Sequence, residues 1–168
     1  MQQALLLRKL LSPTIKTVGV FVNQPIEEVV SFAKSGAINV VQLHGKENRE
    51  YIAELKAKVP MPVIKATGIA DGKVEPYPDN CDYVLLDAAK IKGAGSNGGK
   101  VEWRRYPEID KPFFLAGGIT PENVGEAVTA VRPYGVDTSG GVETDGQKDN
   151  KKIEEYILNI RKINEVNR

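Results

Sequence analysis

The sequence predicts an α/β domain in which parallel strands alternate with helices. Six short runs are nearly continuous in apolar, β-branched or aromatic residues, as strands covered on both faces should be. The runs begin roughly 20 to 30 residues apart, which is the length of a strand and a returning helix. They comprise residues 17–22, 38–43, 62–66, 83–86, 112–116 and 135–138.

Two of the segments between these runs carry strong helix signals. Pro25 stands at a first-turn position, and apolar residues then recur three, four and seven positions after Ile26. Thr120 and Pro121 precede the same spacing, which starts at Val124. We expect a helix in each of these segments, and we expect the second to open immediately after the run at 112–116.

Three further segments complete the pattern. Residues 47–58 place apolar side chains on one side of a helix, and Asp149 is an N-cap for a final amphipathic helix. A helix over residues 3–11 begins the chain. In residues 68–80, two glycines and two prolines predict that the helix is short or missing.

Composition places the chain among soluble proteins with a single domain, here residues 1–168. The 168 residues have a formal net charge of +1, which gives no electrostatic footprint for nucleic acid or an anionic membrane. Cys81 is the only cysteine, so an intrachain disulfide is excluded and a reducing, cytoplasmic location is expected. The apolar run at residues 4–7 is too short for a signal core or a membrane span.

Two architectures fit six such repeats. A closed βα barrel has eight strands, so six strands behind a leading helix look like a barrel without its first strand, first helix and second strand. A six-stranded open sheet with helices on both faces would cover the strands equally well. The period of the sequence does not separate the two.

Two glycine-bearing strand ends indicate a phosphate site. The runs at 112–116 and 135–138 both stop at small residues whose main-chain N–H groups can approach an anion closely. The helix after the first run would also direct its positive dipole end toward that place. In parallel strands these ends converge, so we expect Gly117, Gly118, Ser139, Gly140 and Gly141 to bind a phosphorylated small molecule.

Several motifs resemble the phosphoribosylanthranilate isomerase family of tryptophan biosynthesis. They occur in family order over nearly the whole chain, at residues 18–23, 41–45, 85–87, 116–124, 131–137 and 139–143. The resemblance implies a (βα)8 barrel that converts N-(5-phosphoribosyl)anthranilate to its carboxyphenylamino-deoxyribulose phosphate by an Amadori rearrangement. It implies neither a cofactor nor a metal.

The resemblance also implies roles for individual residues. Asp87 matches the general acid that opens the ribose ring, and Asp137 and His44 match residues that line the substrate site. The family base is a cysteine in a Lys-Ile-Cys-Gly motif, which this sequence does not contain, and the segment with the family's carboxylate-binding arginine is missing too. Cys81 stands at the start of a strand and is no substitute. We therefore expect the isolated chain to be nearly inactive.

Structural explanations remain open for these residues. A strand-end aspartate such as Asp87 or Asp137 can simply satisfy backbone donors, and His44 can cap a turn. The family usually has a serine where this chain has Gly140, so a hydroxyl contact would be replaced by the main chain. The glycine-rich segment 93–98 fits an active-site loop or a surface linker.

Two other functions are compatible with the sequence. In the first, the chain is a non-catalytic module that binds a phosphorylated ligand and self-associates through the exposed sheet edges at residues 17–22 and 135–138. A related phosphoribosyl isomerase of histidine biosynthesis is the second, although the motif at residues 41–45 argues against it.

Overall fold

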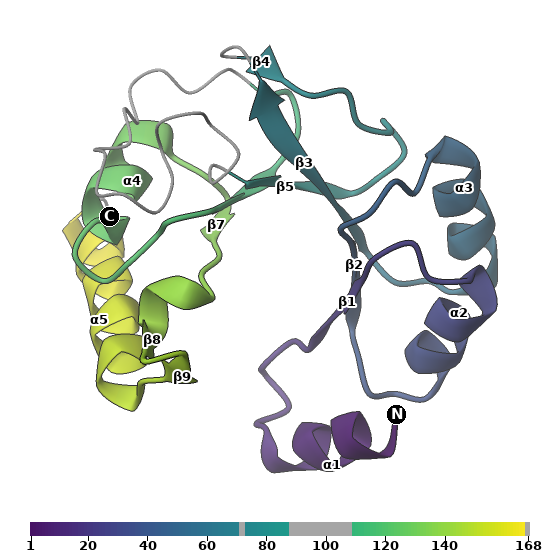
Figure 1. Cartoon of the computed structure of the whole chain (residues 1–168), viewed down its shortest axis with the longest axis horizontal. Helices are drawn as coiled ribbons and strands as arrows, with labels where there is room; N and C mark the ends of the chain where they lie inside the picture. The colour runs from purple at the N-terminus through teal and green to yellow at the C-terminus, as the bar shows by residue number, and fades with distance from the viewer. Residues whose placement is uncertain (71–72, 88–108, 167–168) are drawn as a thin grey trace. The chain divides into compact units, whose positions relative to one another are not determined.

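The computed structural model describes residues 1–70, 73–87 and 109–166 (Figure 1). It forms two compact units, one made of Met1–Thr67 and Pro76–Val84, the other of Gly68–Glu75 and Leu85–Arg168. The strands of the larger sheet pair in the order β1-β2-β3-β5-β6-β7, with β4 beside β3. This order follows the sequence, as a chain of βα repeats predicts.

The first unit contains a parallel βαβαβ arrangement. Its elements are β1 (Val18–Phe21), α2 (Ile26–Lys34), β2 (Val40–Leu43), α3 (Arg49–Lys58) and the start of β3 (Val63–Ala70). Strand β2 pairs in parallel with both β1 and β3. The helices α2 and α3 lie side by side next to these strands (Figure 1). Fully buried side chains fill the space between them: Val29, Val41, Leu43, Ile52, Leu55 and Val63.

The helix boundaries in this unit follow the local capping chemistry. Pro25 is the N-cap of α2 and not its first residue, and its ring sets the backbone angle that leads into the helix. Helix α3 begins at Arg49, later than the predicted residue 47, because the Asn48 side chain caps it by accepting a hydrogen bond of 3.0 Å from the Tyr51 N–H. Glu47 is buried instead and takes part in another network.

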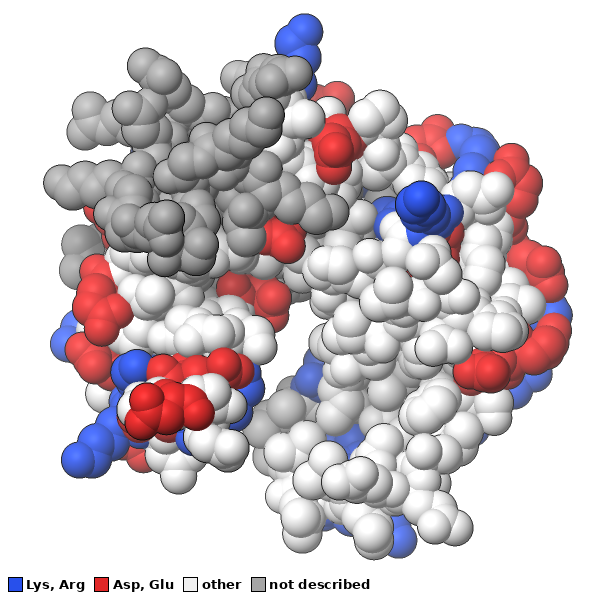
Figure 2. Space-filling view, viewed as in Figure 1, with Lys and Arg blue, Asp and Glu red and all other residues white. Residues whose placement is uncertain are grey.

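The predicted first helix is present as α1 (Gln2–Leu10), but it buries none of its residues. Leu6, Leu7 and Leu10 are exposed by 63%, 57% and 83%. The surface over α1, at the bottom of Figure 2, is largely uncharged, whereas charges of both signs cover the outer side of α2 and α3. Helix α1 therefore presents an apolar surface.

The second unit contains the end of β5 (Tyr83–Asp87), β6 (Phe113–Ala116), α4 (Val124–Val131), β7 (Gly135–Val136) and α5 (Asn150–Val166). Strands β6 and β7 are parallel and align Phe114 with Gly135. One hydrophobic cluster lies under α4 and α5. Its buried members are Leu115, Ile119, Val124, Ala127, Val142 and Tyr156.

Two antiparallel features go beyond the predicted repeat. Strand β3 continues through the buried Gly68 to Ala70, where it pairs with β4 (Lys73–Val74). Within the described part of residues 68–80 there is no helix, which confirms that prediction. A 3₁₀ turn (Gly140–Val142) and a hairpin of β8 (Glu143–Thr144) and β9 (Gln147–Lys148) follow β7. No helix in the described parts of the chain is both long and apolar enough to cross a membrane.

Candidate functional site

The loop after β6, residues 117–120, is shaped by two glycines. Gly117 and Gly118 have φ angles of +85° and +69°, in the left-handed region that side chains disfavour. The Asn123 side chain holds the loop, because it accepts from the Thr120 N–H at 2.8 Å and donates to the Gly118 carbonyl at 2.9 Å. Helix α4 starts only at Val124. The expectation that it opens immediately after the strand end is wrong, because a turn at residues 121–123 comes first.

The loop after β7, residues 137–141, packs directly against this β6 loop. The Asp137 N–H donates to the Leu115 carbonyl at 2.8 Å, and the Thr138 hydroxyl donates to the Ile119 carbonyl at 2.6 Å. A Cβ atom on Gly141 would lie only 1.9 Å from the Ile119 carbonyl oxygen. Glycine is therefore required at 141, and the two loops are in van der Waals contact.

Several main-chain donors in the two loops are available. Among the described residues, no acceptor takes up the N–H groups of Gly118, Gly140 or Gly141. Gly118 and Gly140 are exposed, and a Cβ atom on Gly140 would have no neighbour within 4 Å. Such donors beside open space can bind an anion.

Both predicted aspartates also follow strands of this sheet. Asp87 is the half-buried last residue of β5, which is next to β6 in the strand order. Asp137 follows β7 and is exposed. Burial, and then the negative charge of Asp137, raises the pKa of Tyr156, whose buried hydroxyl has no hydrogen-bond partner among the described residues. Asp87 and the two glycine loops thus occupy the ends of three strands that are consecutive in the sheet.

His44 belongs to the first unit and follows β2. Its main-chain N–H donates to the Phe21 carbonyl at 2.8 Å, and its Nδ1 lies 3.3 Å from the Gln42 amide nitrogen. Capping of α3 is performed by Asn48 and not by His44. The role of His44 in lining a substrate site stays a prediction.

A buried ion pair in the first unit was missed by sequence reasoning. The Lys65 ammonium lies 3.4 Å from the Glu47 carboxylate and donates to the carbonyls of Leu43, Gly45 and Ala66. Glu47 in turn accepts from the N–H groups of Asn23 and Gly45 at 2.7 and 3.0 Å. The only sequence signal for this ion pair is Lys65 itself, a lysine inside the apolar run at residues 62–66. The pair ties together the segments that follow β1 and β2.

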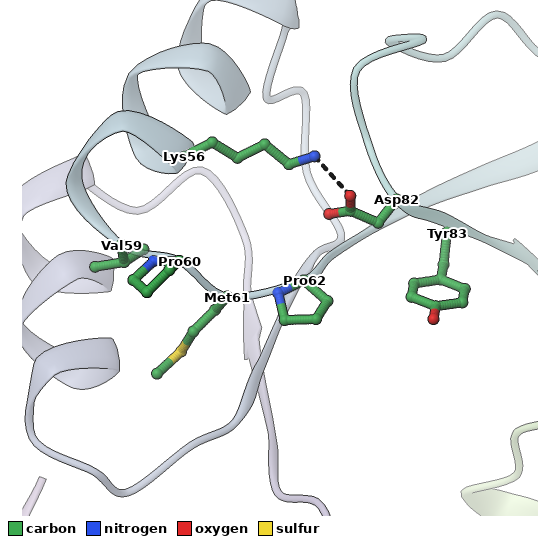
Figure 3. Close-up of a pocket in the computed structure, with 7 residues that line it drawn as sticks. All are labelled: Lys56, Val59, Pro60, Met61, Pro62, Asp82 and Tyr83. Carbon is green, nitrogen blue, oxygen red and sulfur yellow. Dashed lines mark hydrogen bonds and ion pairs between the residues drawn. The ribbon is translucent and has the colours of Figure 1, made fainter.

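A surface pocket of about 420 Å³ lies where β3 and β5 begin, whereas the predicted site residues lie at the other ends of strands. Figure 3 shows its lining at the start of β3 and β5, where the Lys56 ammonium pairs with the Asp82 carboxylate at 2.7 Å. Cys81 precedes β5, as predicted, and is a buried free thiol. None of the predicted site residues lines the pocket.

The glycine-rich segment 93–98 lies outside the described residues. In the parts of the chain that the structure describes, no three His, Cys, Asp or Glu side chains are grouped as a metal site would require.

Comparison with known proteins identifies the family. The family model of N-(5'-phosphoribosyl)anthranilate isomerase, PRAI, matches residues 3–159. The chain belongs to this family. An isomerase of that name from Endomicrobium trichonymphae is 41% identical over 156 residues, which cover 93% of this chain and 78% of the relative.

Solved PRAI structures have the same fold. TrpF from Jonesia denitrificans is similar with a TM-score of 0.78 and 32% identity, over 97% of this chain and 79% of that one. A PRAI in complex with reduced 1-(o-carboxyphenylamino)-1-deoxyribulose 5-phosphate is similar with a TM-score of 0.73 and 30% identity, over 96% and 79% of the two chains. The predicted fold class, a TIM-barrel fold represented here by six parallel strands, is confirmed, and the open doubly wound sheet is excluded.

Proposed function

We propose that the chain acts in the PRAI reaction, with the substrate phosphate held by the β6 and β7 loops and Asp87 as general acid. The contact of Gly141 with the Ile119 carbonyl is the observation that carries this proposal. It brings the two loops together, so that they can form a single site. A phosphorylated compound bound to a related isomerase supports the substrate class.

The proposed chemistry is a proton relocation on the sugar. The Asp87 carboxylic acid donates a proton to the ring oxygen of the ribose, so that the ring opens toward an iminium at C1. Removal of the C2 proton by a base then gives an enamine, which becomes the ketose product. Such positioned proton transfers contribute roughly 10² to 10⁴ in rate.

The sequence does not contain the Lys-Ile-Cys-Gly motif whose cysteine is the family's base for the second step. Cys81 is the single cysteine, and it is buried before β5, at the strand end opposite to Asp87. We therefore expect the isolated chain to bind the phosphorylated ligand while its turnover stays close to the background rate.

Binding and turnover test the two parts of the proposal separately. Calorimetric titration with the reduced deoxyribulose phosphate compound should show binding, and the same compound without its phosphate should bind much more weakly. The variant Asp87→Asn should keep this affinity and lose whatever turnover the chain shows above the background rate. Absence of binding would contradict the phosphate site. Turnover at a rate normal for the family would contradict the expectation that the missing cysteine is essential.

A second candidate function is self-association without catalysis. Strand β1 ends the strand order, and Val18 and Val20 on it are exposed by 44% and 57%. Such an edge can pair with another copy. Sedimentation alongside calorimetry separates the proposals, since tight ligand binding by a monomer disfavours association. We also propose a cytoplasmic location, which the free thiol of Cys81 supports.

A further inference from the structure

Lys148 on strand β9 contacts Ser139, one of the residues predicted to bind phosphate. Its ammonium donates to the Ser139 carbonyl oxygen and to the Ser139 hydroxyl oxygen, both at 3.0 Å, and it forms an ion pair with the Glu143 carboxylate. An ammonium group has three protons, and these three acceptors use all of them. Lys148 therefore has no donor left for a ligand while it makes these contacts.

We propose that Lys148 is a positioning residue that sets the geometry with which Ser139 and Gly140 bind phosphate. The inference rests on the phosphate site proposed above and adds a residue that does not itself touch the ligand.

The first step of the argument concerns the peptide between Ser139 and Gly140. A trans peptide is planar, so its carbonyl and its N–H point in opposite directions. By holding the Ser139 carbonyl, Lys148 fixes the direction of the Gly140 N–H, which has no acceptor among the described residues. This matters at a glycine, because its backbone is the most free to rotate.

The second step concerns the Ser139 hydroxyl. A hydroxyl has one proton to donate and oxygen lone pairs to accept. Since its oxygen accepts from Lys148, its proton is left to donate elsewhere, and Ser139 is exposed to solvent. Lys148 thus turns Ser139 into a donor suited to a phosphate oxygen.

The third step excludes a simple charge effect. Glu143 lies opposite Lys148 in the β8–β9 hairpin, and the carboxylate offsets the ammonium charge. The Lys152 ammonium also donates to the Glu143 carbonyl at 2.6 Å, which holds the hairpin to the start of α5. Lys148 acts mainly through hydrogen-bond direction.

The test compares Lys148→Met with Lys151→Met. Both variants remove one positive charge from the same region, but Lys151 is three residues further along and is exposed at the start of α5. The ligands are the reduced deoxyribulose phosphate compound and its form without phosphate. We expect K148M to lose roughly ten-fold in affinity for the phosphorylated ligand only, K151M to stay close to wild type, and Lys148→Arg to restore part of the loss because it keeps donors.

A double-mutant cycle with Ser139→Ala adds a readout that a purely structural role would not change. In the S139A background the effect of K148M should be smaller, since only the contact with the carbonyl remains. Equal affinities of K148M and K151M, or an equal loss for both ligands, would overturn the inference while the phosphate site stands. A wild-type chain that does not distinguish the two ligands would overturn the phosphate site itself and the inference with it.

Discussion

Gly141 shows how one missing side chain decides whether two loops can meet. Any Cβ atom there collides with a main-chain oxygen, which cannot rotate away as the end of a flexible side chain can. The Thr138 hydroxyl, which donates to the same Ile119 carbonyl, would lie 2.6 Å from the added atom. The contact between the loops therefore depends on the residue type at 141.

Gly141→Ala should destabilise the protein and weaken phosphate binding. Overpacking of this kind costs about 1–3 kcal/mol, and the β7 loop has to move away from the β6 loop. Thermal unfolding and calorimetric titration measure the two effects. Gly140→Ala is the matched control for stability, because its Cβ atom meets nothing within 4 Å. Equal unfolding temperatures for both variants would contradict this packing.

The buried pair of Glu47 and Lys65 acts at the same scale. Both side chains are at least nine-tenths buried, and each has hydrogen bonds to the main chain besides the ion pair. Removal of one partner leaves a charge in a poorly solvated place, which is more costly than the absence of both charges.

Glu47→Gln should lower the free energy of unfolding by about 3–5 kcal/mol, as for other broken buried pairs. In a Lys65→Met background the further loss should be smaller, since no unpaired ammonium is then left behind. Chemical denaturation of the two single variants and the double variant measures this coupling. Strict additivity of the two losses would show that the residues do not interact.

At the scale of elements, α5 is fixed by its N-cap. The Asp149 carboxylate accepts from the Lys151 N–H at 2.9 Å and from the Thr144 hydroxyl at 2.8 Å, so it joins the helix to the hairpin. The Thr144 hydroxyl and the main-chain N–H groups of Lys152 and Lys151 lower the pKa of Asp149 from its ordinary 3.8. The fold thus favours the ionised form.

Asp149→Asn should lower the unfolding temperature by a few degrees at neutral pH, and this difference from wild type should vanish in acid. Because the folded pKa is lowered, the stabilisation is present above the unfolded pKa and is lost as the pH falls through the folded pKa. Unfolding temperatures at a series of pH values measure it. Asp145→Asn, the same change on the hairpin turn, should stay near wild type, and a gap that persists in acid would contradict the role of the charge.

At the scale of the whole molecule, β1 is a terminal strand of the larger sheet. The side chains of Val18 and Val20 are exposed on it, and α1 adds exposed leucines. Unpaired strand edges and apolar patches both favour association with another chain. These two features support self-association, the second candidate function proposed above.

Val20→Lys should shift the protein toward the monomer, since a lysine on an edge strand opposes pairing. Analytical ultracentrifugation at several concentrations measures the shift. Leu7→Lys on α1 is the comparison, because it changes the helix surface and leaves the edge intact. A wild-type chain that is monomeric at every concentration would rule out this association.

Most of the fold could be predicted from local patterns. All six predicted strands and all five predicted helical segments are present, because apolar spacing and capping residues such as Asn48 and Asp149 act within a few residues. The boundaries of two elements depend on contacts outside the local pattern. Helix α4 starts after a turn that depends on Asn123, and β3 extends past Gly68 because it finds a partner in β4.

By itself, the sequence determined the βα repeat, the family and the two glycine-bearing strand ends. The tertiary structure alone decided that Gly141 packs on Ile119, that Lys148 holds Ser139, and that Lys65 is buried against Glu47. The physical reason is distance along the chain. Periodicity and capping are properties of neighbouring residues, whereas these contacts join segments whose approach depends on how the intervening elements pack.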